Sequence, residues 1–139
     1  MDTTSGTSVS QAQYCLEMKV RDYECDMQGI VNNAVYQNYL ETARHEFLLS
    51  KGLSFAELTA RGVILVMIRA ELDYRQSLRA EDKFTVAVSV RQSSRLKLVF
   101  DQEIRRRING ELILEAKITT TSLNQRGRPC FPEELKGLL

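Results

Sequence analysis

The sequence predicts an α+β fold in which one long helix covers a five-stranded antiparallel sheet. Apolar residues recur at helical spacing over one long stretch, residues 34–51. Alternating, β-branched stretches fill most of the chain after Gly62, and one further stretch precedes the helix. A sheet with one apolar face must be covered, and this helix is the large element available to cover it.

The long helix is predicted from residues at three- and four-residue spacing, which form one broad apolar face. Asn32 or Asn33 is predicted to cap it, because a short amide side chain can accept hydrogen bonds from free backbone N–H groups. A second, short helix is predicted over residues 54–60, with Ser54 as its cap. The apolar face comprises Val35, Tyr36, Tyr39, Leu40, Ala43, Phe47 and Leu48.

The later strands are predicted to follow one another as a meander. The Asn109-Gly110 pair predicts a two-residue hairpin, since both residues tolerate positive φ. Residues 1–13 are predicted to be a frayed tail, and residues 14–139 a single domain. One helix covers such a sheet poorly, so a homodimer or homotetramer is expected. The predicted strands are 14–23, 63–74, 84–91, 96–108 and 111–123.

The composition is that of a globular protein, with 43% hydrophobic and 27% charged residues. Its 19 basic and 18 acidic residues nearly cancel, which predicts no general attraction to nucleic acid or to an anionic membrane. No apolar stretch is long enough to span a bilayer, so membrane insertion is not expected. The 3 cysteines lack the spacing of a zinc site or a disulfide framework, and the start of the chain lacks a secretory signal. The expected compartment is the cytoplasm.

The segment 22–44 (DYECDMQGIVNNAVYQNYLETAR) resembles the signature of the 4-hydroxybenzoyl-CoA thioesterase-like hotdog family. Parts of residues 20–48 also resemble the plant branch of acyl-lipid thioesterases and methylketone synthases. The likeness covers most of the chain after residue 13. It implies a hotdog fold and hydrolysis of an acyl-CoA or acyl-ACP thioester, with no cofactor or metal. The matching residues are Asp26, Gly29, Ile30, Val31, Tyr36, Tyr39, Glu41 and Arg44.

The resemblance implies that Asp26 is the nucleophile or the general base, and that the backbone N–H of Asn33 polarises the thioester carbonyl. Gly29 would let substrate approach the backbone closely. The physical basis is sound, because first-turn N–H groups are unpaired and lie at the positive end of the helix dipole. An anhydride intermediate and base-activated water both remain open.

Glu41 is an alternative carboxylate, because another hotdog branch places its catalytic acid on the helix. It lies about 12 Å along the helix from Asn33, so only a partner subunit could bring it to the site. It is otherwise expected to pair with Arg44 or with a strand. His45, at about 18 Å from Asn33 along the axis, is expected to be a surface or interface residue.

Substrate contacts are predicted at two kinds of position. Tyr36 and Met67 are candidates to line an acyl tunnel between helix and sheet. Arg91, Arg95 and Lys97, near a turn between strands, are candidates to contact coenzyme A phosphates or an acidic carrier protein.

Two other functions stay open from the sequence. One is an acyl-binding hotdog domain without turnover. The other is a hotdog hydratase or dehydratase, whose chemistry needs a histidine paired with an acid near the helix start, where this chain has none.

Overall fold

The computed structural model describes residues 12–139. The tail predicted over residues 1–13 therefore lies almost entirely outside the described residues. Gln13 is within them, and its side chain accepts from the Val90 N–H and donates to the Leu138 carbonyl. The elements are β1 (Tyr14–Lys19), η2 (Asp22–Glu24, a 3₁₀ turn), α1 (Asn33–Ser50), α2 (Phe55–Ala60), β2 (Ile64–Tyr74), β3 (Lys83–Ser94), β4 (Lys97–Arg106), β5 (Leu112–Leu123), β6 (Pro129–Cys130) and α3 (Glu133–Lys136).

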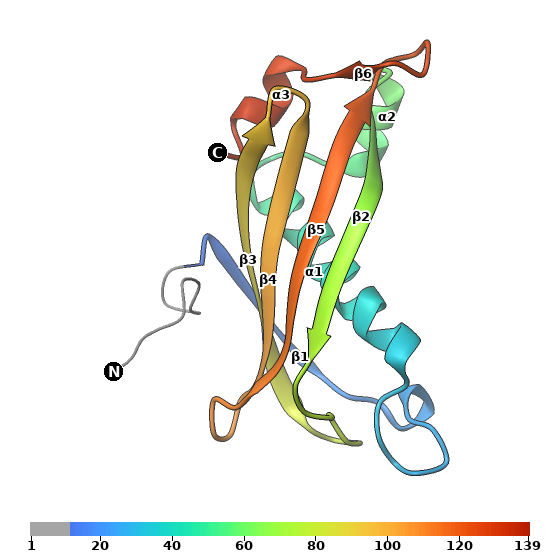
Figure 1. Ribbon diagram of the computed structural model, residues 1–139, viewed down its shortest axis with the longest axis vertical. Helices are drawn as coiled ribbons and strands as arrows, with labels where there is room; N and C mark the ends of the chain where they lie inside the picture. Colours follow the sequence, from blue (N-terminus) through green and yellow to red (C-terminus); the bar gives the residue numbers. More distant parts are fainter. Residues whose placement is uncertain (1–11) are drawn as a thin grey trace.

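The long strands form one antiparallel sheet in the order β1-β3-β4-β5-β2, and short β6 pairs with β5 (Figure 1). The predicted five long strands are confirmed, but the predicted four-strand meander is wrong. Only β3, β4 and β5 follow one another, whereas β2 pairs with β5 at one edge and β1 with β3 at the other. The outer edge of β2 has no partner strand among residues 12–139.

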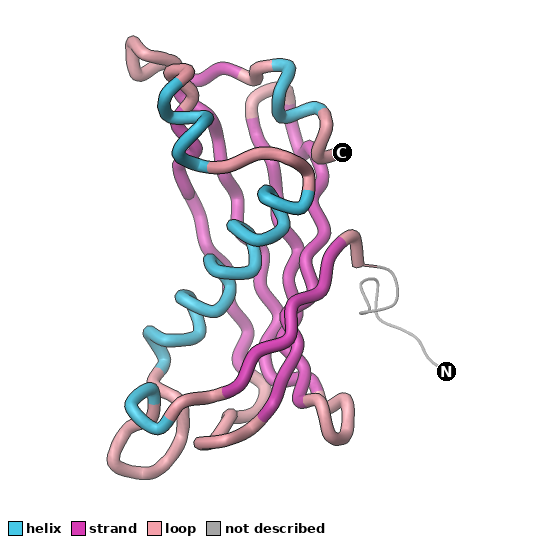
Figure 2. The backbone as a smooth tube through the Cα atoms, turned by 180° about the vertical axis from the view of Figure 1, so that it is seen from behind, coloured by secondary structure: helices cyan, strands magenta, loops and turns pink. Residues whose placement is uncertain are grey.

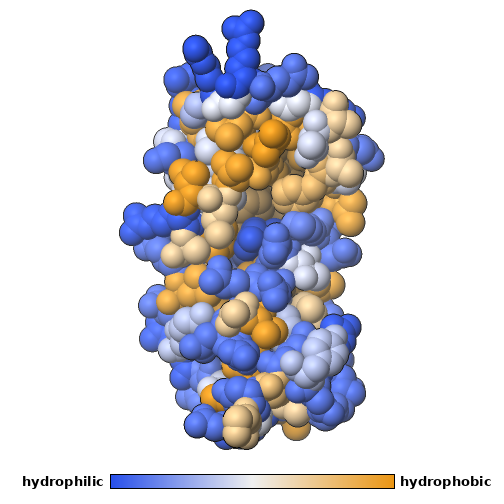
Figure 3. Space-filling view, turned by 90° about the vertical axis from the view of Figure 1, so that its right-hand side faces the viewer, coloured by the Kyte–Doolittle hydropathy of each residue, from blue (hydrophilic) through white to orange (hydrophobic). Residues whose placement is uncertain are grey.

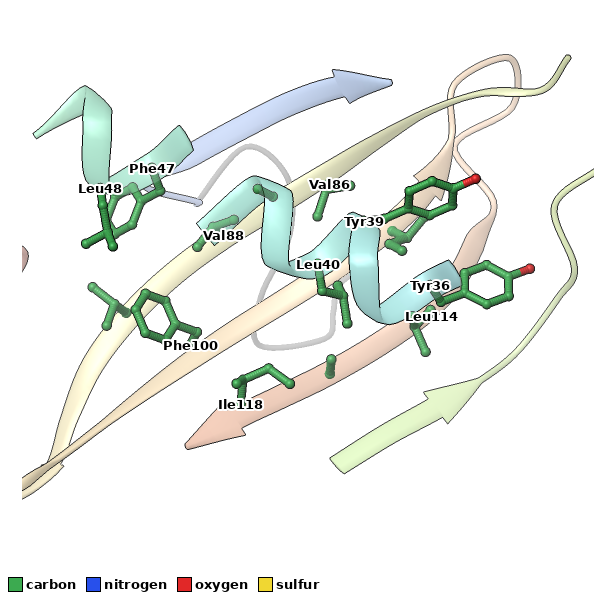
Figure 4. Packing of buried hydrophobic residues seen from close by; sticks show 14 of the residues in the cluster. Tyr36, Tyr39, Leu40, Phe47, Leu48, Val86, Val88, Phe100, Leu114 and Ile118 are labelled. Carbon is green, nitrogen blue, oxygen red and sulfur yellow. The ribbon is translucent and has the colours of Figure 1, made fainter. Parts of the chain in front are cut away.

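Helix α1 lies across the inner face of the curved sheet (Figure 2). Its apolar face packs on inward-pointing residues of β3, β4 and β5, and Figure 4 shows Phe47 and Leu48 near Phe100, with Leu40 over the sheet centre. The predicted apolar face is confirmed: all but half-buried Val35 are buried. No helix within residues 12–139 is long and apolar enough to cross a membrane.

The helix ends differ slightly from prediction. Helix α1 begins at Asn33, and Asn32 occupies the N-cap position, but its side chain makes no capping hydrogen bond there. The amide cap predicted for it is therefore wrong. Ser54 does cap α2, because its hydroxyl accepts from the Glu57 N–H at 3.0 Å.

Two strand ends were also misjudged. Strand β1 ends at Lys19 rather than at residue 23, and Val20 instead donates its N–H to the Asp82 carbonyl. The β4–β5 turn is longer than two residues, since Arg106 and Glu111 pair across it. Ile108 lies in this turn and is exposed rather than on an inner strand face.

The outer face of the sheet carries charged side chains around an open cleft of about 510 Å³. Arg91 pairs there with Asp101 at 2.8 Å. Glu103 is nearly buried beside Arg105, at 3.1 Å. Burial raises the pKa of the Glu103 carboxyl, although Arg105 opposes the shift. Acidic side chains outnumber basic ones in the lining of this cleft, which lies away from α1.

Candidate active site

A closed loop leads into α1. Cys25 pairs with Val31 across its neck, and the Asp26 N–H donates to the Ile30 carbonyl at 2.9 Å. Gly29 adopts a φ of 80°, a conformation that favours glycine, at the turn of the loop. The loop neck closes at Val31, only two residues before α1 begins at Asn33. Loop and helix start therefore lie together at one end of the molecule (Figure 1).

The Asp26 carboxylate is held by its own loop. Its Oδ1 accepts from the Gln28 N–H at 2.8 Å and from the Ile30 N–H at 3.4 Å. The Oδ2 atom has no hydrogen-bond partner among residues 12–139. The side chain is exposed. One carboxylate oxygen is thus fixed, and the other is available to a water molecule or a substrate.

The first turn of α1 offers free donors. The N–H groups of Asn33 and Ala34 make no hydrogen bond within the described part of the chain, whereas the Val35 N–H is already used by the Asn32 carbonyl. No acidic side chain lies in this turn to compete for the free groups. They sit at the positive end of an 18-residue helix, where an oxyanion is favoured.

Two tyrosines of α1 hold the Asp26 loop and the adjoining segment around Leu78 in place. The Tyr39 hydroxyl donates to Glu24 at 2.7 Å, and burial together with this hydrogen bond raises the pKa of Tyr39. The Tyr36 hydroxyl accepts from the Leu78 N–H at 2.9 Å. The Leu78 carbonyl in turn accepts from the Val31 N–H at the loop neck. The loop is therefore tied to the helix through side chains that also belong to the core.

The comparisons with known proteins agree with this arrangement. The sequence profile of the thioesterase-like superfamily matches residues 20–139. The chain belongs to this superfamily. It is 41% identical over 114 residues to the acyl-acyl carrier protein thioesterase ATL3, chloroplastic, of Arabidopsis thaliana, covering 82% of this chain and 60% of the relative. It therefore spans about three fifths of that relative's length.

Two further relatives extend the comparison. The long-chain acyl-CoA thioesterase FadM of Escherichia coli is 30% identical over 103 residues, covering 74% of this chain and 77% of FadM. The crystal structure of a 1,4-dihydroxy-2-naphthoyl-CoA thioesterase from Synechocystis superposes with a TM-score of 0.84 at 19% identity, covering 88% of this chain and 92% of that one. The α+β fold of this thioesterase-like protein is thus the hotdog fold.

Tyr36 was predicted to line an acyl tunnel, but it is buried in this thioesterase-like protein and its hydroxyl is occupied. Tyr36→Phe would leave the buried Leu78 N–H unpaired. The free energy of unfolding should therefore fall by about 1–3 kcal/mol, measured by urea denaturation. Tyr23→Phe is the matched control, because the Tyr23 ring is exposed and its hydroxyl is unbonded within residues 12–139. Equal stability of the two variants would contradict the anchoring role.

Glu41 and His45 lie beside each other rather than at the loop. Glu41 Oε2 is 3.6 Å from His45 Nε2, so the predicted pairing of Glu41 with Arg44 is wrong. The Arg44 guanidinium instead donates to Gln102, beneath the helix. The His45 ring packs on Phe55, with centroids 4.1 Å apart, and is half-exposed. Within a single subunit, therefore, neither Glu41 nor His45 lies at the Asp26 loop.

The predicted carrier contacts lie at the far end of the thioesterase-like fold. Arg95 sits in the β3–β4 turn, and Lys97 begins β4, at the opposite end of the sheet from the Asp26 loop (Figure 1). Arg91 belongs to the outer face. Within one chain these residues do not meet the loop, and only a partner subunit could bring them there.

Cys25 adjoins Asp26 but is a poor nucleophile. Burial raises the pKa of its thiol, and the nearby carboxylates of Asp22 and Asp26 raise it further. A neighbouring carboxylate disfavours the thiolate because like charges repel. Within residues 12–139, no cluster of metal-ligating side chains is arranged to hold an ion.

Two features of functional interest, one beside the loop and one further along α1, gave no signal in the sequence. Arg79 pairs with Ile30 across a backbone bridge, which places it beside the Asp26 loop. Thr120 lines a pocket between α1 and β2, together with Met67. Both depend on contacts between segments far apart in the chain, so periodicity along the sequence gives no signal for them.

Proposed function

We propose that the protein hydrolyses acyl-CoA or acyl-ACP thioesters to a free acid and a thiol. The observation that supports it most is a carboxylate with one free oxygen, within residues 12–139, in the loop that leads directly into the first turn of α1. Within residues 12–139, Asp26 keeps one oxygen unbonded, and α1 starts just beyond the loop with unpaired N–H groups at Asn33 and Ala34. Thioester hydrolysis needs both a base or nucleophile and an oxyanion site.

In the first form of the mechanism, Asp26 accepts a proton from water as the water oxygen bonds to the carbonyl carbon. The carbonyl oxygen gains the negative charge and accepts from the Asn33 N–H. The C–S bond then breaks, and the proton on Asp26 passes to the leaving thiolate. In the second form, an Asp26 oxygen bonds to the carbon and the C–S bond breaks, so that the thiolate leaves and an anhydride remains. Water then hydrolyses the anhydride, which frees the acid, restores the Asp26 carboxylate and supplies the proton that the thiolate takes up. Gly29 shapes the loop that presents the carboxylate.

The proposed substrates follow from the chemistry and from the relatives. ATL3 is an acyl-acyl carrier protein thioesterase, and FadM is a long-chain acyl-CoA thioesterase. A hydratase is disfavoured because His45 stands about 18 Å along α1 from Asn33, against Phe55 and Glu41. An acyl-binding domain without turnover would have no need of a carboxylate in the loop that leads to the start of α1.

The decisive measurement is the release of free thiol from a panel of aliphatic and aromatic acyl-CoA and acyl-ACP thioesters. We expect hydrolysis of at least one member by the wild-type protein, without added metal or cofactor. Tight binding of an acyl-CoA with no thiol release from any member would favour the binding domain instead. Hydration of an enoyl-CoA in place of hydrolysis would favour the hydratase.

We further propose that Arg79 contacts the phosphate groups of the carrier. It flanks the Asp26 loop, and its guanidinium makes no ion pair within residues 12–139, whereas neighbouring Arg75 and Arg106 are both paired with carboxylates. Arg79→Gln should raise KM about ten-fold with little change in kcat, since a charge-assisted hydrogen bond is lost. Arg126→Gln, in the turn at the far end, is the control. Equal KM values for both variants would refute the contact.

We propose that the protein works as a homodimer or homotetramer in the cytoplasm. The unpaired outer edge of β2, with half-exposed Met67 and Ile68, is a surface that a second chain can cover. Three free cysteines suit a reducing compartment. Light scattering should give the mass of two or four chains, and a single-chain mass at micromolar concentration would contradict the assembly.

A further inference from the structure

A small pocket of about 90 Å³ lies between α1 and β2, with α2 at its rim. Figure 3 shows the face of the molecule on which it lies, where apolar side chains gather around a hollow. Its lining joins apolar walls to a few polar groups. The apolar residues are Phe55, Leu65, Val66, Met67 and Phe100, and the polar ones are Glu41, Arg44, His45 and Thr120.

Thr120 is the unusual member of this lining. It lies on β5 between Met67 of β2 and Leu98 of β4, on the face of the sheet that α1 covers. The residue is 6% exposed, and its hydroxyl has no hydrogen-bond partner within residues 12–139. Buried hydroxyls nearly always have a partner, because leaving one unpaired costs its full desolvation penalty. The hydroxyl is therefore a candidate hydrogen-bonding partner for a group bound in the pocket.

Arg44 supplies donors to the same pocket. One of its N–H groups donates to Gln102 at 3.0 Å, and Gln102 donates in turn to the Leu40 carbonyl at 3.0 Å. No carboxylate forms an ion pair with Arg44 in the described part of the chain, and Glu41 engages His45. Burial lowers the pKa of Arg44, and only the charge of Glu41 opposes this. Most of the guanidinium donors thus remain available.

The pocket lies along α1 from the proposed reaction site. The Tyr74 ring packs on Tyr36 in the first helical turn, with centroids 5.6 Å apart, and further along Met67 and Arg44 line the same pocket. Strand β2 therefore accompanies α1 from the helix start to the pocket. Asn33 and Arg44 are about 16 Å apart along the axis. A bulge in β2 follows Met67, and bulges often re-aim side chains next to functional sites.

We propose that this pocket binds the end of the acyl group remote from the thioester, and that Thr120 and Arg44 select acyl groups with an oxygen at that end. The inference rests on the proposed function, with the thioester carbon at Asp26 and Asn33. Arg44 can only donate, and the Thr120 hydroxyl can do so too, so the group they share is an acceptor oxygen. A plain methyl end would leave both residues unsatisfied. A hydroxyl and a carboxylate both supply the required oxygen.

The test compares kcat/KM for dodecanoyl-CoA, ω-hydroxydodecanoyl-CoA and ω-carboxyundecanoyl-CoA. The wild-type protein should prefer at least one oxygenated substrate about ten-fold, the value of one well-made hydrogen bond. Preference for the hydroxyl or for the carboxylate identifies which oxygen the pocket takes. Thr120→Val should lower the ratio, with the remainder due to Arg44, and Thr120→Ser should restore the full preference. Thr119→Val, one position along β5 on the opposite face, should leave the ratio unchanged.

The proposal is overturned if the wild-type protein treats all three substrates alike, or if Thr120→Val keeps the full preference. Failure of the proposed function is recognised separately, because no thioester would then be hydrolysed. In that case, calorimetry with the non-hydrolysable thioethers S-dodecyl-CoA and S-(ω-hydroxydodecyl)-CoA tests whether the pocket prefers an oxygen at the chain end. Tighter binding of the hydroxylated thioether by the wild type, but not by Thr120→Val, supports it, and equal binding rejects it.

Discussion

Replacing Asp26 with Asn is expected to lower kcat for thioester hydrolysis by about 10²–10⁴-fold, the usual contribution of a positioned general base. The amide oxygen of Asn can still accept from the Gln28 and Ile30 N–H groups, so the loop keeps its shape. The amide cannot take a proton from water or form an anhydride at neutral pH. The substitution therefore removes the chemistry of the carboxylate while sparing the structure around it.

The measurement is single-turnover thiol release, with the far-ultraviolet circular dichroism and melting temperature of each variant as folding checks. Asp22→Asn is the matched control, four residues earlier on the exposed turn η2, and should retain wild-type turnover. Glu41→Gln tests the alternative carboxylate on α1. Undiminished hydrolysis by Asp26→Asn, together with a large loss in Glu41→Gln, would transfer the catalytic role to the helix.

Phe47→Ala is expected to lower the free energy of unfolding by about 3–5 kcal/mol, through lost burial and the cavity left behind. Phe47 is fully buried where α1 crosses the sheet, with its ring 6.1 Å from that of Tyr14 and 6.4 Å from that of Phe100. A typical domain is stable by only about 5–15 kcal/mol, so the loss is a large fraction of the total. Urea denaturation at one fixed protein concentration measures it, because assembly would shift the midpoint.

Leu49→Ala is the control on the same helix, because Leu49 is exposed and its truncation leaves no cavity. It should cost no more than about 0.5 kcal/mol, as surface substitutions usually do. A similar loss for both variants would mean that Leu49 is covered by another chain in solution. A small loss for Phe47→Ala would contradict the packing of α1 on the sheet.

The candidate site could be predicted only in part. Asp26 and Gly29 fall in a short, contiguous segment, so their place in the loop before α1 followed from sequence order. Their roles in catalysis stay predictions. The pairing of Glu41 was misjudged because Arg44 turns beneath the helix to reach Gln102, which lies 58 residues away in the chain. Helical spacing says which residues share a face, but not which strand residue each one meets.

The sequence by itself determined the local structure: the extent of α1 to within a residue, the Ser54 cap of α2 and the existence of five long strands. These depend on periodicity and on capping, which act over a few residues. Only the tertiary structure decided that β2 pairs with β5, that Arg79 flanks the Asp26 loop, and that Thr120 is buried with no hydrogen-bond partner among the residues that the structure describes. The physical reason is that strand pairing and burial depend on which distant segments meet, and many orders of the same strands satisfy the same local pattern.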